Sequence, residues 1–283
     1  MTNADALRAW IGRTETRVDR LTPTPVAALA ATLDRDDPPP APGDPLPPLW
    51  HWLYFLPLAR QSEIGSDGHA KRGGFLPPVP LPRRMWAGGR LDFLQPLHVG
   101  ERVERTSRIA DVTSKDGRSG PLVFVLVRHE IAGERGLAIA EEHDIVYRGE
   151  PQAGERTAAG RPAPGGPMWT RTIHPDDVLL FRYSALTFNG HRIHYDRRYV
   201  TEVEGYPGLV VHGPLIATLL VDLLRRHRPE ATVARFAFRA LSPLFDVAPF
   251  SVNGKLEDGD ARVSLWAANA AGELAMDATA DLA

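Results

Sequence analysis

Cysteine is absent from the 283-residue sequence, which excludes disulfide bonds, thiolate metal sites and a cysteine nucleophile. Long apolar runs are missing too. The richest one, residues 46–58, is interrupted by prolines and is shorter than the roughly 18 residues that a membrane-spanning helix needs. Residues 1–10 carry acidic and polar side chains where a secretory signal would need a basic start and an apolar stretch. We therefore expect a cytoplasmic protein that does not insert into a membrane.

The sequence also lacks an excess of charge of either sign. Lys plus Arg (33) nearly balance Asp plus Glu (35), and the net charge is -2. Such a chain has no broad attraction for nucleic acid or an anionic membrane, so an anionic ligand must be bound by a few local groups. A glycine-rich phosphate loop after a strand and a Gly-x-Ser-x-Gly turn are both missing. Their absence disfavours a nucleotide-dependent enzyme and an α/β-hydrolase.

Residues 149–167 contain glycine, proline and alanine in place of every large apolar residue. This composition predicts a linker. It separates an N-terminal domain, residues 1–148, from a C-terminal domain, residues 168–283, and each is long enough to fold as a small domain.

The two halves show the same order of predicted elements. Each opens with an extended stretch and a helix that starts near a proline, at residues 17–33 and 170–186. Each continues with an apolar helix that has proline in its first turn, at 48–53 and 214–219. Strands rich in β-branched residues close the halves, at 102–112, 122–131 and 137–147, and at 250–256, 262–268 and 274–281. This order predicts an α+β fold in which each antiparallel sheet wraps around a central helix.

The halves differ in their connections. The second half has a longer segment between its two predicted helices than the first, and this insertion contains two histidines, an asparagine, an arginine and an aspartate within residues 189–196. An imidazole titrates near neutral pH, so a histidine here could move a proton, although a solvated loop is the alternative. The first half instead has a segment rich in proline and glycine, residues 65–90. We expect it to be a loop that covers a site.

Residues 189–196 (Asn-Gly-His-Arg-Ile-His-Tyr-Asp) and 211–214 (Val-His-Gly-Pro) resemble the signature of the MaoC-like, R-specific hot-dog hydratases and dehydratases. The resemblance covers nearly all of the second half, and the first half resembles the diverged, non-catalytic hot-dog that precedes it in two-domain members. Residues 183–196 are most similar to the subgroup of mesaconyl-C4-CoA (3-methylfumaryl-CoA) hydratases and type 2 hydroxyacyl-thioester dehydratases. The resemblance implies a double hot-dog fold. It also implies a lyase that reversibly hydrates a 2-enoyl thioester, carried by coenzyme A or acyl carrier protein, without a separate cofactor.

The resemblance further implies catalytic roles. His194 matches the family histidine, the base that activates water or removes the α proton. The backbone N–H of Gly213, at the start of the central helix, would stabilise negative charge on the thioester oxygen. Asn189 stands where the family usually has an aspartate, and an amide can hold a water but cannot exchange protons. His194 then acts alone, which we favour, or His191 or Asp196 is the second titrating group.

Other residues are candidates for substrate binding. Arg192 could bind a substrate carboxylate with two N–H groups, and His191 lies beside it in the same loop. Arg239 is on one face of a predicted strand, 233–241, and could contact coenzyme A phosphates; surface solubility is the alternative. His69 in the predicted covering loop could reach phosphates or a carboxylate. We expect His212 to brace the start of the central helix.

Two other functions stay open at the level of sequence. One is an acyl-CoA thioesterase, which the missing carboxylate at position 189 disfavours. The other is a non-catalytic subunit that binds an acyl thioester. The histidine spacing does not match a helical zinc site, so we expect no bound metal. The duplicated halves can form the equivalent of a dimer within one chain, and a further homodimer is left open.

Overall fold

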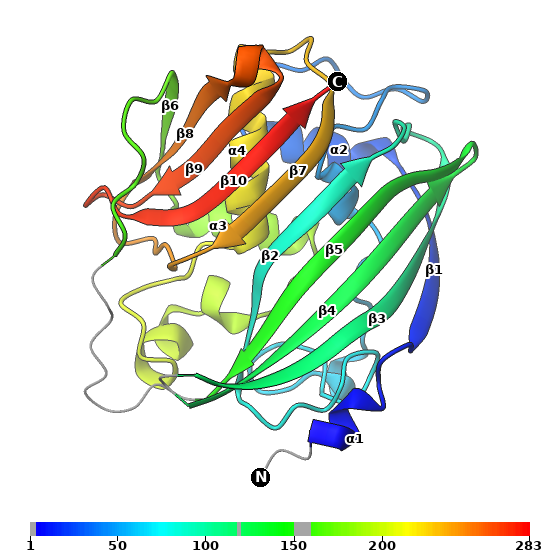
Figure 1. Ribbon diagram of the computed structural model, residues 1–283, viewed down its shortest axis with the longest axis vertical. Coiled ribbons are helices and arrows are strands. Elements are labelled where there is room, and N and C mark those ends of the chain that lie inside the picture. Colours follow the sequence, from blue (N-terminus) through cyan, green and yellow to red (C-terminus); the bar gives the residue numbers. More distant parts are fainter. Residues whose placement is uncertain (1–3, 118–119, 150–159) are drawn as a thin grey trace.

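The computed structural model describes residues 4–117, 120–149 and 160–283. Its strands form one antiparallel sheet of ten strands in the order β1-β3-β4-β5-β2-β7-β10-β9-β8-β6. The helices α2, α3 and α4 lie together on one face of this sheet, behind the strands in Figure 1. Among the described residues, no helix is both long enough and apolar enough to cross a membrane.

The first half of the chain supplies the strands β1 to β5 and the second half supplies β6 to β10. The strands of the first half are β1 (Thr14–Arg20), β2 (Arg83–Phe93), β3 (Arg102–Gly117), β4 (Gly120–Gly133) and β5 (Gly136–Arg148). Those of the second half are β6 (Trp169–Ile173), β7 (Val233–Ala240), β8 (Phe250–Glu257), β9 (Arg262–Ala268) and β10 (Leu274–Leu282). The α-helices are α1 (Ala4–Arg8), α2 (Pro23–Thr32), α3 (Asp177–Leu186) and α4 (Gly213–His227). The short helical turns are η1 (Trp50–Leu53), η2 (Gln61–Glu63), η3 (Arg192–His194), η4 (Tyr199–Val203) and η5 (Asp258–Asp260).

The same strand order occurs twice, read outward from the middle of the sheet. β2 and β7 occupy the centre and pair antiparallel, and β1 and β6 form the two outer edges. Each central strand is followed outward by the last, fourth and third strands of its own half. This arrangement confirms the α+β double hot-dog fold that the resemblance implies.

One part of the sequence interpretation is wrong. We expected loop throughout residues 65–90, but residues 83–90 belong to the central strand β2. Two glycines, Gly88 and Gly89, suggested a loop, but they are needed because both neighbouring strands lie close to β2 here. A Cβ atom on Gly88 would lie 2.6 Å from the carbonyl oxygen of Phe238 in β7, and one on Gly89 would lie 2.9 Å from that of Glu142 in β5. The residues before β2 do form an irregular covering segment, as expected.

The predicted apolar helix of the first half is also much shorter than that of the second. Only the single turn η1 forms there, because Leu49 has a left-handed backbone, with φ at 71°, and the helix cannot extend backwards through it. The corresponding helix of the second half, α4, has fifteen residues, and every residue from Leu215 to Leu224 is buried. Apolar side chains from both halves pack with α4 in one continuous core. The two copies are therefore joined by their core as well as by their sheet.

A buried ion cluster fixes α4 to the first half. The Asp222 carboxylate, which is 1% exposed, accepts hydrogen bonds from Arg35 at 2.6 Å, Arg171 at 2.9 Å and Arg226 at 2.7 Å. Arg171 and Arg226 also donate to the carbonyl oxygen of Leu33, directly after α2. A buried carboxylate is tolerated only with such partners, so the cluster sets the position of α4 against α2 and β6.

Part of the predicted linker, residues 150–159, lies outside the described residues. The next residues contact the second copy: Arg161 accepts a backbone hydrogen bond from Leu274 at 2.7 Å, and Ala163 donates one to Gly272 at 2.9 Å. Residues 161–163 thus extend along the turn between β9 and β10. The domain boundaries at 148 and 168 stay a prediction.

Candidate active site

The insertion of the second half begins where α3 ends. Asp176 caps the start of α3 by accepting the backbone N–H of Leu179 at 2.8 Å. At the other end Phe188 adopts a left-handed backbone, and the chain turns so that the N–H of Asn189 donates to the carbonyl oxygen of Ser184 at 2.8 Å. This turn directs residues 189–194 back toward the start of α4.

His194 is buried, with 8% of its surface exposed, and one ring nitrogen is fixed by the backbone. Its Nδ1 lies 2.7 Å from the carbonyl oxygen of Val210. A carbonyl can only accept, so Nδ1 carries the proton in the neutral ring and Nε2 is left as a basic acceptor. This is the tautomer that a general base requires.

The His194 ring stacks on the ring of His212, with the ring centres 3.7 Å apart and an angle of 17° between the planes. His212 immediately precedes α4, and its Nε2 lies 2.8 Å from the Ser184 hydroxyl of α3. It therefore braces the start of the helix through α3 and does not cap it with its side chain. His194 is thereby held beside Gly213, the first residue of α4, whose N–H has no partner within the helix. The first copy borders the same place, because a Cβ on Gly213 would lie 3.9 Å from the carbonyl oxygen of Trp86 in β2.

Burial keeps these imidazoles neutral. Desolvation lowers the pKa of His194 from 6.5 to about 4, although its hydrogen bond to Val210 opposes the shift. Desolvation lowers the pKa of His191 to about 2, and the nearby His69 and His194 add to the effect. The pKa of His212 also lies well below the ordinary value, chiefly because of burial. At neutral pH these rings are thus uncharged.

The covering loop of the first copy contacts the insertion through the backbone. Arg192 donates its N–H to the carbonyl oxygen of Asp67 at 2.9 Å. Gly68 has a positive φ of 90°, and a Cβ on it would lie 1.8 Å from the carbonyl oxygen of Gly190. Only glycine allows this approach, which brings residues 67–69 against residues 190–192.

The contact places Asp67 and His69 beside His191. The His69 Nδ1 lies 3.2 Å from the Asp67 carboxylate, and the rings of His69 and His191 are 4.0 Å apart at their centres. One potential ligand atom from each of the three residues lies within 4.8 Å of the other two, so the group could hold a metal ion. We did not expect this from sequence. The positive charges of Arg72 and Arg84 act on His69, and they disfavour a cation at this position.

The structure brings most of the predicted site residues together, with different contacts. The Asn189 side-chain oxygen accepts the N–H of His191 at 3.0 Å, so it is already engaged. The Arg192 guanidinium donates to Asp196 at 2.8 Å and to the carbonyl oxygen of Ser66 at 3.0 Å. Asp196 also accepts the N–H of Tyr199 at 3.0 Å. These bonds tie the insertion to itself and to the covering loop, and they leave Asp196 a structural role.

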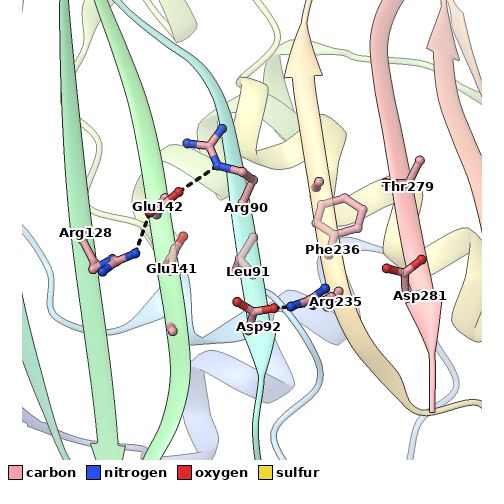
Figure 2. Close-up of a pocket in the computed structure, with 12 residues that line it drawn as sticks. Arg90, Leu91, Asp92, Arg128, Glu141, Glu142, Arg235, Phe236, Thr279 and Asp281 are labelled. Carbon is pink, nitrogen blue, oxygen red and sulfur yellow. Dashed lines mark hydrogen bonds and ion pairs between the residues drawn. The ribbon is translucent and has the colours of Figure 1, made fainter. Parts of the chain in front are cut away.

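Arg239 is not part of this group. It is exposed on β7, on the face opposite the buried side chain of Phe238. An open cavity of about 360 Å³ lies nearby on the outer face of the sheet (Figure 2). Its charges are mostly paired, with Arg90 and Arg128 bonded to Glu142 and Arg235 bonded to Asp92. This cavity is on the side of the sheet away from α4, so it is separate from His194.

A double hot-dog with a neutral, backbone-tethered histidine beside the start of its central helix defines the class as hot-dog hydratases and dehydratases. The family model described as hydroxyacyl-thioester dehydratase type 2 matches residues 49–246. The chain belongs to this family, and it is a lyase of the hydratase and dehydratase type.

Individual relatives agree with this membership. The chain is 51% identical to the mesaconyl-C(4)-CoA hydratase of Chloroflexus aurantiacus, over 100% of this chain and 99% of that protein. It is 31% identical to the mitochondrial hydroxyacyl-thioester dehydratase type 2 of Schizosaccharomyces pombe, over 73% of this chain and 77% of the other. Among solved structures it is similar to HtdX of Mycobacterium tuberculosis, with a TM-score of 0.65, 19% identity, and coverage of 95% of this chain and 99% of that one. That likeness supports the fold.

With His194 as the predicted base, its lowered pKa predicts the pH dependence of the reaction. A histidine with its ordinary pKa of 6.5 would lose the basic form in mild acid, whereas His194 keeps it until the pH approaches 4. We expect kcat/KM for a 2-enoyl-CoA to stay level between about pH 5.5 and 8. A half-maximal rate near pH 6.5 would contradict this.

The acid side needs a stability control. Because the folded pKa of His194 is depressed, the unfolded chain binds the proton first, and stability falls as pH drops from 6.5 toward 4. Measuring Tm at each pH shows whether activity falls because His194 is protonated or because the protein unfolds.

The Gly68 contact predicts a large effect of one methyl group. Gly68→Ala should lower hydratase kcat/KM by about tenfold or more, because the covering loop must move away from residues 190–192. Gly73→Ala is a matched control: its φ is 91°, but nothing lies within 4 Å of the added Cβ. Equal activity and equal Tm for the two variants would show that the contact is unimportant.

Proposed function

We propose that this chain catalyses the reversible hydration of mesaconyl-C4-CoA (3-methylfumaryl-CoA), with His194 as the acid and base. The observation that carries the mechanism is the buried His194 ring, whose Nδ1 is held by the Val210 carbonyl oxygen so that Nε2 is basic. The relative of that name, 51% identical along the whole chain, supports the choice of substrate.

In hydration, His194 Nε2 takes a proton from water while the water oxygen forms a bond to the β carbon. The electrons of the double bond move to the thioester oxygen, where the Gly213 N–H and the positive end of the α4 dipole stabilise the charge. The enolate then collapses and its α carbon takes the proton back from His194 Nε2. Dehydration follows the same steps in reverse. No separate cofactor enters the scheme, and coenzyme A is part of the substrate.

The proposal also covers the thioester carrier, the location of the enzyme and the number of chains that form the site. We expect the enzyme to use coenzyme A rather than acyl carrier protein, following the name of the 51% identical relative. A cytoplasmic location stays our prediction from the sequence. A second chain is not needed to build the site, because both copies are parts of one polypeptide.

An absorbance assay tests the function against its two rivals. Purified protein is mixed with mesaconyl-C4-CoA, and the ultraviolet absorbance of the conjugated thioester and the free thiol are followed together. Hydration removes the absorbance without releasing thiol. Thiol release would indicate a thioesterase, and binding without either change would indicate a non-catalytic subunit. Either of these results rejects the proposal.

Arg192 remains the proposed ligand of the substrate carboxylate, which 3-methylfumaryl-CoA carries on its β carbon. Its side chain is two residues from His194, and its bonds to Asp196 and Ser66 leave two guanidinium N–H groups for a ligand. Arg192→Ala should raise the KM for mesaconyl-C4-CoA by about tenfold or more and spare crotonyl-CoA, which lacks the carboxylate. Equal losses with both substrates would show that Arg192 only holds the two loops together.

A further inference from the structure

The covering loop of the first copy contains a carboxylate–imidazole pair. Both oxygens of Asp67 bind His69: one accepts its backbone N–H at 3.0 Å, and the other lies 3.2 Å from Nδ1. The hydrogen bonds from His69 keep the pKa of the Asp67 carboxyl well below its usual range, although burial opposes them, so the group is ionised and can only accept. His69 Nδ1 therefore carries the proton, and Nε2 is a basic acceptor.

His69 and His194 are thus prepared alike. In each ring Nδ1 is bound to a protein oxygen, which leaves Nε2 basic, and the His191 ring lies next to both. Its centre is 4.0 Å from that of His69 and 5.5 Å from that of His194. The supports differ, because a carboxylate stabilises a positively charged imidazole and a neutral carbonyl does so less.

Two of the three groups that the sequence suggested as partners of His194 are occupied, and the third, His191, packs its ring between those of His69 and His194. The Asn189 oxygen accepts the backbone N–H of His191. Asp196 accepts from Arg192 and from the backbone of Tyr199. Water in the site still needs a second acceptor, since only one of its two O–H groups can face His194.

We propose that the Asp67–His69 pair of the first copy acts in the active site of the second, where His69 Nε2 holds the reacting water. This inference rests on the proposed function and assigns a catalytic residue to a half that the sequence marks as non-catalytic. In hydration, one O–H bond of the water breaks toward His194 Nε2 while the oxygen bonds to the β carbon. The other O–H bond stays intact and donates to His69 Nε2. In dehydration the same contact holds the departing hydroxyl group.

The charges around His69 fit water better than a metal ion. Arg72 and Arg84 both act on its ring, and Asp67 is the carboxylate bonded to it. Two guanidinium charges against one carboxylate leave a net positive charge, which disfavours a divalent ion more than a neutral water. The rival reading, a metal held by Asp67, His69 and His191, is one outcome of the test.

The test compares His69→Asn with the wild type on mesaconyl-C4-CoA. Asparagine can still donate to Asp67 from Nδ2, but it has no acceptor at the position of Nε2. We expect kcat to fall by about 100-fold with little change in KM. His98→Asn, the same substitution at a histidine outside the cluster, should leave kcat unchanged.

Rescue separates a catalytic role from a structural one. His69→Gly should regain part of its lost kcat when imidazole is added, because a free imidazole can occupy the vacated space beside Asp67. Wild-type kcat in His69→Asn, or a loss in His69→Gly that imidazole does not reverse, would overturn the inference.

Two measurements on the wild-type protein test for a metal centre and for the proposed function itself. Loss of wild-type activity in EDTA that zinc restores would replace the water-holding role by a metal centre and so overturn the inference. A wild-type protein without hydratase activity would reject the proposed function itself, before any variant is compared.

Discussion

The hydrogen bond between His194 Nδ1 and the Val210 carbonyl oxygen constrains everything else in the site. A buried imidazole can be a base only if it is neutral and one ring nitrogen carries no proton. Burial supplies the first condition and the Val210 contact supplies the second. Stacking on His212 then fixes the ring beside the first turn of α4, whose leading N–H groups have no partner within the helix.

The two copies of the duplicated fold differ in structure, and each contributes different parts of the site. The second copy keeps a long, fully buried α4 and adds the insertion with His194. The first copy reduces its central helix to the turn η1 and supplies the covering loop, which reaches the insertion through Gly68 and Gly190. The core around α4, which both halves share, and the Asp222 ion cluster hold the two copies in register. The candidate active site therefore lies where the copies meet.

The sequence predicts local structure well where periodicity and capping determine it. The expected strand at 262–268 coincides with β9, and the helix expected within 170–186 is α3. It failed at β2, because the glycines that allow close strand contact have the same composition as a loop. It also missed the pairing of Asp67 and His69 with His191, since that contact joins segments more than a hundred residues apart and depends on the fold. For His194, burial and the Val210 contact follow from tertiary packing, which no spacing of residues reveals.

Replacing one residue tests the central claim most directly. In His194→Asn, the side-chain amide can still donate to the Val210 carbonyl oxygen, but the basic nitrogen is gone. We predict that kcat/KM for mesaconyl-C4-CoA falls by about 1000-fold or more, within the range known for general acid–base catalysis, while Tm changes little. A folded His194→Asn protein with wild-type turnover would contradict the account.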